Sequence, residues 1–201
     1  MKWLKKIGVI LIGILLAGIY SYRTWPAAIY DTNVDSAAYE NVGELKDGAS
    51  VEQSFLCEHN GLNAIEITAS NLGFSSDVEY HWKVQETHSE DIVGEGILTS
   101  KDIDNSQKTV FHLEKQKNSK NKEYLFVIEA EAGETEHGIT VMKTKADKNQ
   151  DENLVLNGTR QEGVMVLSQQ VHYLNIETGI VFIGVYLYFV LFMRFLLRLF
   201  K

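Results

Sequence analysis

Residues 78–85 read VEYHWKVQ, and this stretch indicates the fold class. Every even-numbered side chain in it is apolar, and every odd-numbered one is polar or charged. Successive side chains of a β-strand point to opposite faces of the sheet, whereas a helix would repeat its apolar positions every three or four residues. The stretch therefore predicts a strand with one face in a hydrophobic core and the other in water.

The same pattern recurs outward from this strand in both directions. Residues 122–131 read KEYLFVIEAE, and shorter apolar runs occupy residues 53–57, 64–69, 92–99, 109–114, 138–143, 153–156 and 163–171. Turn-rich segments separate these runs, and no helical periodicity lies between them. The sequence thus predicts an antiparallel, jelly-roll-like β-sandwich of about nine strands over residues 51–173, preceded by a polar linker over residues 25–50.

The C-terminal segment is of a different kind. Residues 176–201 read IETGIVFIGVYLYFVLFMRFLLRLFK, with no charged side chain from residue 179 to residue 193. A helix of roughly 22 residues spans the ~30 Å hydrocarbon core of a bilayer, and Arg194 and Arg198 can extend their charged ends towards water. We therefore expect a transmembrane helix and a basic cytoplasmic end within residues 174–201.

The N-terminal segment, MKWLKK followed by an uncharged run over residues 7–22, has two interpretations. It is either a signal peptide cleaved near Ala27 and Ala28, or an uncleaved first membrane span over residues 1–24. The length of the apolar run favours the span. Basic residues lie outside both apolar segments, so the positive-inside rule predicts cytoplasmic termini and an extracellular middle domain.

Small residues within both apolar segments are candidates for close helix packing in lipid. They are Gly8, Gly13, Ala17, Gly18, Gly179 and Gly184. Two readings of them stay open, because they either pack the two helices on each other or on another membrane protein, or simply reflect the abundance of glycine in membrane helices.

Charge and cysteine content restrict the partners and the compartment. Residues 31–175 contain 26 acidic and 12 basic residues, so this segment has a net charge of 12 − 26 = −14. Such an excess argues against nucleic-acid binding. The single cysteine, Cys57, excludes an internal disulfide framework, which favours a bacterial envelope protein over a eukaryotic cell-surface protein.

Residues capable of catalysis occur without a recognisable arrangement. The six histidines lack the spacing of a metal site, and no serine lies in a nucleophile motif. Cys57 is expected to be a buried thiol, and acidic pairs such as Glu90–Asp91 and Asp151–Glu152 are expected by chance among so many carboxylates. We predict no catalytic residue, no metal and no cofactor, and hence a protein that is not an enzyme.

Two groups of residues are candidates for ligand binding. The aromatic side chains of Tyr80 and Trp82 could stack on sugar rings, although the pattern favours a core position for Trp82. The segment KQKNSKNK, residues 115–122, is a basic loop in an acidic domain, and Lys117, Lys120 and Lys122 could contact a phosphate-bearing polymer or lipid headgroups. The alternative for this loop is a hairpin exposed only to water.

Several stretches of the middle segment resemble a known family. They are VEQSFLCEHNGLNAIEIT at residues 51–68, the strand at residues 78–86, NKEYLFVIEAE at residues 121–131 and NLVLNGTRQEGVMVLS at residues 153–168. The segment is similar to the galactose-binding-like jelly rolls attached to bacterial membrane glycosyltransferases and cell-surface polysaccharide assembly proteins. The resemblance implies a fold and a cellular setting, but it carries over no binding residues.

These observations predict a two-span membrane protein with an extracellular β-sandwich. The expected function is accessory: recognition of a cell-envelope glycan, or scaffolding of a multi-pass membrane partner such as a glycosyltransferase, in polysaccharide assembly. The lipid bilayer is the remaining expected partner, and nucleic acid is not one. The alternatives are a surface adhesin, a purely structural subunit without ligand and, with less support, a glycan hydrolase.

Overall fold

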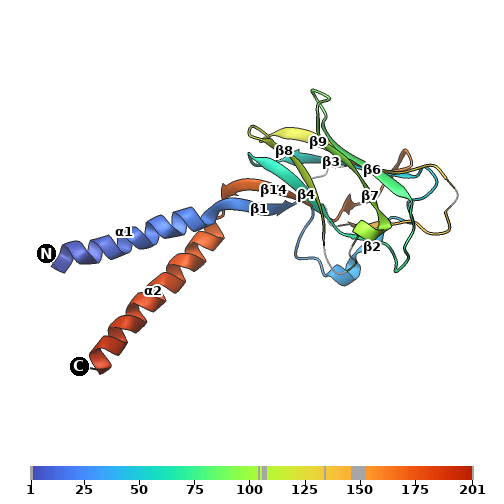
Figure 1. The fold of residues 1–201 in the computed structure, drawn as a ribbon. Helices are drawn as coiled ribbons and strands as arrows, with labels where there is room; N and C mark the ends of the chain where they lie inside the picture. Colours follow the sequence, from blue (N-terminus) through green and yellow to red (C-terminus); the bar gives the residue numbers. More distant parts are fainter. Residues whose placement is uncertain (1, 104, 106–107, 134, 146–152, 201) are drawn as a thin grey trace. The chain divides into compact units, whose positions relative to one another are not determined.

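A computed structural model describes residues 2–103, 105, 108–133, 135–145 and 153–200, with side chains from residue 7 onward. The chain forms two compact units (Figure 1). One unit combines Met1–Trp25 with His172–Lys201 and contains both α-helices, and the other comprises Pro26–Val171. The boundary between the units falls within two strands, β1 and β14.

Fourteen strands are present in the described part of the chain, not the nine that were expected. Nine of them coincide with the expected runs: β3 (Ser50–Cys57), β4 (Leu62–Ile67), β6 (Glu79–Glu86), β7 (Ile92–Thr99), β8 (Thr109–Gln116), β9 (Lys122–Ala130), β10 (Thr140–Thr144), β11 (Leu154–Leu156) and β14 (Leu167–Leu174).

The other five are β1 (Tyr22–Ala28), β2 (Glu40–Asn41), β5 (Ala69–Ser70), β12 (Thr159–Gln161) and β13 (Val164–Met165). Of these, β13 lies within the expected run of residues 163–171, which the structure divides between β13 and β14. Four of these strands have only two or three residues, which is too short for an alternating pattern to be recognised. Two short 3-10 helices, η1 (Ser36–Ala38) and η2 (Ser100–Asp102), complete this list. Residues 25–50, expected as a linker, thus contribute β2 and part of β1 to the sheets.

The strands form three sheets, with the orders β1-β14-β4-β8, β13-β10-β2 and β12-β11-β3-β9-β6-β7. Strand β5 pairs with β10 beside the second of these. The pairings among β2 to β14 are antiparallel. Strand β6, which contains the alternating stretch of residues 79–85, pairs with both β9 and β7.

The core lies between the six-stranded sheet and the sheet that contains β4 and β8. The Phe111 ring of β8 lies 5.1 Å from the Phe126 ring of β9, and the Gln169 side-chain amide of β14 donates to the Leu56 carbonyl of β3. On β6, Tyr80 and Val84 are buried while His81 and Lys83 are exposed. The all-β, sandwich-like fold predicted by the alternation is thereby confirmed.

The remaining unit contains α1 (Lys2–Ser21) and α2 (Ile176–Leu199). Helix α2 has 24 residues, none of them buried, and is long and apolar enough to cross a membrane by length and composition. It is the only such helix in the described part of the chain. The apolar part of α1 in the described residues is the shorter segment Ile7–Ser21, so length and composition support one of the two expected spans.

Helices α1 and α2 contact each other through small residues and three aromatic side chains. The Tyr186 ring lies against Gly13, where a β-carbon would clash with it, and its hydroxyl donates to the Val9 carbonyl at 2.6 Å. The Tyr20 and Phe182 rings stack with centroids 5.4 Å apart. The hydroxyl therefore has a backbone acceptor within the helix pair, as an apolar environment requires.

Of the six small residues predicted to pack helices closely, three are in contact or buried and three are not. Gly13 lies against Tyr186, Gly179 lies against Ser21, and Ala17 is only 3% exposed. The structure leaves open space around the other three, Gly8, Gly18 and Gly184, since a β-carbon there would meet nothing within 4 Å.

Candidate functional site around Trp82

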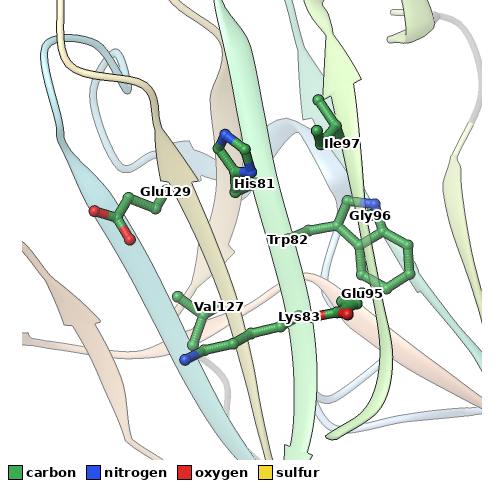
Figure 2. Close-up of a pocket in the computed structure, with 8 residues that line it drawn as sticks. All are labelled: His81, Trp82, Lys83, Glu95, Gly96, Ile97, Val127 and Glu129. Atoms are coloured by element: carbon green, nitrogen blue, oxygen red, sulfur yellow. The ribbon is translucent and has the colours of Figure 1, made fainter.

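A shallow hollow of about 410 Å³ lies over the outer face of the six-stranded sheet (Figure 2). We call it the outer hollow. Strands β6, β7 and β9 supply its lining: His81, Trp82, Lys83, Glu95, Gly96, Ile97, Val127 and Glu129.

Strand register brings the outward side chains of this hollow together in two rows. His81 of β6 lies opposite Glu129 of β9 and Ile97 of β7. One pleat further along, Lys83 lies opposite Val127 and Glu95. Directly opposed residues have β-carbons about 4.5–5.5 Å apart, so each row can present its polar groups to one ligand. In Figure 2, the Lys83 side chain extends from β6 towards Val127.

Trp82 lies between His81 and Lys83 in sequence, but its ring belongs to the inner side of the sheet. The indole contacts the Phe111 ring of β8 edge-on, with centroids 5.0 Å apart. It also covers Gly96 on the neighbouring strand, where a β-carbon would lie 2.8 Å from the indole nitrogen. Figure 2 shows the indole extending from β6 across β7 beside Gly96. The missing side chain at Gly96 therefore makes room for the half-buried ring at the edge of the sheet.

A second hollow, of about 510 Å³, lies between β7 and β8, and Trp82 and Ile97 line both hollows. We call it the edge hollow. Strands β7 and β8 are the end strands of their sheets, so the space between them is not closed by a further strand. Besides Trp82, its lining consists of Ile97, Leu98, Asp102 and residues 108–112. Both volumes fall in the range of small-ligand sites, about 300–1,000 Å³.

Two of the charged groups in the edge hollow already have partners within the protein. The Asp102 carboxylate accepts hydrogen bonds from the Thr99 amide and hydroxyl, at 2.7 and 2.9 Å. Lys108 forms an ion pair with Glu66. The Thr109 hydroxyl oxygen is buried and has no hydrogen-bond partner within the described structure. The two hollows thus contain charges of both signs, although the domain as a whole is strongly acidic.

The outer hollow contains two carboxylates, Glu95 and Glu129, and a pair of carboxyl groups is what most glycoside hydrolases use for catalysis. Glu95 and Glu129 belong to strands separated by β6 and are offset by one pleat along the strands, which places their backbones roughly 12 Å apart. Retaining glycosidases hold their carboxyl groups at about 5–5.5 Å, and inverting ones at about 6.5–9.5 Å. A hydrolytic mechanism that used this pair would therefore require both side chains to extend towards each other across β6.

Tyr80, the other aromatic candidate, is a core residue in this structure. Its side chain is fully buried, its hydroxyl donates to the Leu45 carbonyl at 3.2 Å, and it accepts from the Ile139 amide at 3.0 Å. Burial raises the pKa of Tyr80. Its ring has no face available for a sugar.

The three candidate lysines lie on the connection from β8 to β9, which joins two different sheets, and differ in their surroundings. Lys117 and Lys120 are exposed, whereas Lys122 forms an ion pair with Glu86 at 2.7 Å. The fully buried Ser119 hydroxyl anchors this connection by donating to the His59 carbonyl and accepting from the Leu62 amide. The structure does not bring these lysines into either hollow.

Metal ligation and thiol chemistry have no evident site in the part of the chain that the structure describes. No group of three or more histidine, cysteine or acidic side chains there is arranged to hold a metal ion. The Cys57 thiol is buried and donates to the His59 carbonyl, and burial raises its pKa. A protonated, inaccessible thiol is a poor nucleophile. Of the acidic pairs, Asp151–Glu152 lies outside the described residues.

Sequence reasoning identified Trp82 but missed Glu95, Gly96, Phe111 and Asp102. One signal was available for Gly96, because Gly94 and Gly96 alternate within an otherwise regular strand pattern, and a glycine inside a strand often marks a close approach. The contribution of β8 depends on pairing between distant segments, which one sequence does not reveal. Comparison of the chain with protein-family models and with curated protein sequences gives no match.

Proposed function

We propose that this chain is a membrane-anchored recognition protein whose β-sandwich binds a glycan outside the cytoplasm. In this proposal α1 and α2 both cross the membrane and both termini are cytoplasmic. The apolar, unburied surface of α2 supports a membrane location, since a soluble protein would bury such a surface. The basic residues beyond the apolar segments support the orientation.

The observation that carries the glycan proposal is the position of Trp82 between two adjoining hollows. An indole offers an apolar surface for the C–H face of a pyranose ring, and the flanking groups offer hydrogen-bond donors and acceptors for its hydroxyls. The outer hollow provides donors on Lys83 and acceptors on Glu95 and Glu129. Because both charge signs are present, an uncharged polyhydroxyl ligand suits the site better than a highly charged one.

The cellular setting is the less direct part of the proposal. The resemblance to galactose-binding-like jelly rolls favours bacterial envelope polysaccharide assembly, with a multi-pass membrane protein as partner. The three glycines with open space around them, Gly8, Gly18 and Gly184, are positions where another membrane helix could approach closely.

The glycan proposal is tested with the full chain in lipid nanodiscs, titrated calorimetrically with a panel of neutral oligosaccharides. We expect at least one of them to bind wild-type protein. The Glu95→Gln variant should bind it roughly tenfold more weakly, as expected for the loss of one charge-assisted hydrogen bond. Glu123→Gln is the matched control, because Glu123 is exposed on β9 and lies outside both hollows.

A Trp82→Leu variant provides the second measurement and should also weaken binding. If no oligosaccharide binds, the glycan proposal is wrong and a purely structural subunit becomes the better description. If Glu95→Gln and Glu123→Gln bind the oligosaccharide with equal affinity, the outer hollow is not the binding site. Release of shortened sugars during the titration would instead indicate a hydrolase.

A further inference from the structure

Arg23 is an isolated cation at the end of α1. It is the only basic residue between Lys6 and Lys46, and it lies two residues beyond Ser21, the last residue of the helix. Its side chain is exposed, and no carboxylate lies within 4.0 Å of it in the part of the chain that the structure describes. The guanidinium therefore retains its hydrogen-bond donors for an external acceptor.

The guanidinium of Arg23 lies over an aromatic ring of α1 that packs against α2. Its central carbon lies 5.3 Å from the centroid of the Tyr20 ring, a cation–π contact. The Tyr20 ring in turn stacks on Phe182 of α2, at 5.4 Å and an interplanar angle of 30°. Arg23 thus contacts an aromatic pair that joins α1 and α2.

The residues around Arg23 are of types that are common at the boundary between lipid and water. The Ser21 carbonyl accepts hydrogen bonds from the Trp25 indole at 2.9 Å and from the Asn175 amide at 3.0 Å. Asn175 is also the N-cap of α2, so the end of α1 and the start of α2 meet at Ser21. Tryptophan and tyrosine are enriched at this depth of a bilayer, where a ring meets lipid and a polar group meets water.

We infer that Arg23 binds the phosphate of a phospholipid headgroup in the leaflet next to the β-sandwich. Arginine suits this task because its planar guanidinium donates two parallel hydrogen bonds to phosphate oxygens. The Tyr20–Phe182 pair keeps it at headgroup depth. This inference rests on the proposed membrane insertion of both helices, and it adds a residue-specific lipid contact on the domain side.

The test uses the full chain with Trp3→Phe and Trp82→Phe, so that Trp25, two residues from Arg23, is the only tryptophan, and it is excited selectively at the red edge of its absorption. The protein is reconstituted into phosphatidylcholine vesicles that contain either brominated phosphatidylglycerol or brominated diacylglycerol, which lacks the phosphate. We expect the phosphatidylglycerol to quench Trp25 severalfold more strongly at equal mole fraction. Arg23→Gln should abolish this difference, and Arg23→Lys should retain part of it.

Arg198→Gln is the control, because it removes the same charge at the other end of α2 and should leave the Trp25 difference unchanged. Equal quenching by both lipids in wild-type protein, or a difference that persists in Arg23→Gln, would overturn the inference. Loss of the difference in buffer containing inorganic phosphate would assign the site to free phosphate and also overturn it. Failure of the protein to float with the vesicles would contradict the membrane proposal itself.

Discussion

At the scale of single residues, Tyr80 and Tyr124 are two fully buried tyrosines on the paired strands β6 and β9. The Tyr80 hydroxyl has two backbone partners, whereas the Tyr124 hydroxyl has no hydrogen-bond partner within the described structure. Burial raises the pKa of both phenols, which keeps them neutral. The sequence pattern cannot distinguish them, because both occupy inward positions of an alternating strand.

This difference predicts opposite outcomes for the same substitution. Tyr80→Phe leaves the Ile139 amide without its acceptor and should lower the free energy of unfolding by about 1–3 kcal/mol. Tyr124→Phe removes an unpaired buried hydroxyl and should be neutral or slightly stabilising. Chemical denaturation of both variants checks this prediction. Equal destabilisation would contradict the hydrogen bonding described here.

At the scale of elements, the strands that alternate over five or more residues were predictable, whereas of the strands with two or three residues only β11 and β13 lie within expected runs. All of β7 and most of β6 and β9 follow the expected runs, because one face of each is buried and the other is wet. Strand β2 has two residues and depends on its pairing with β10, which lies about a hundred residues away in sequence. Trp82 could be proposed as a site residue from the sequence alone. Its packing over Gly96 could not, because that contact also depends on how two strands pair.

The contact between α1 and α2 is an element-scale feature that disulfide formation can test. A β-carbon at Gly179 would lie 3.7 Å from the Ser21 β-carbon, within the distance that disulfides require. We predict that Ser21→Cys with Gly179→Cys forms an intramolecular disulfide under mild oxidation, in a Cys57→Ser background. Protection of both thiols from a maleimide-linked polymer measures it.

The matched control pair is Gly18→Cys with Gly184→Cys, since neither glycine has a neighbour within 4 Å. This pair should stay reactive under the same conditions. Disulfide formation to the same extent in both pairs would mean that the helices do not pack through a defined face.

At the scale of the whole molecule, charge is distributed by segment. The acidic excess lies within residues 31–175, while seven of the 19 basic residues lie in the two terminal segments. This distribution could be read from the sequence, because it needs no knowledge of packing. The number of membrane crossings does not follow from the sequence in the same way. The apolar part of α1 is shorter than that of α2, and only α2 meets the length of a membrane span in the described residues.

The central claim is that two helices cross the membrane and present the β-sandwich outside the cytoplasm. Single cysteines replacing Lys2, Lys120 and Phe200, each in a Cys57→Ser background, test it by labelling intact bacterial cells with a membrane-impermeant maleimide. Labelling of Lys120→Cys in intact cells, and of Lys2→Cys and Phe200→Cys only after permeabilisation, is the predicted result. Labelling of either terminal cysteine in intact cells, or loss of position 2 from the mature protein, would contradict the account.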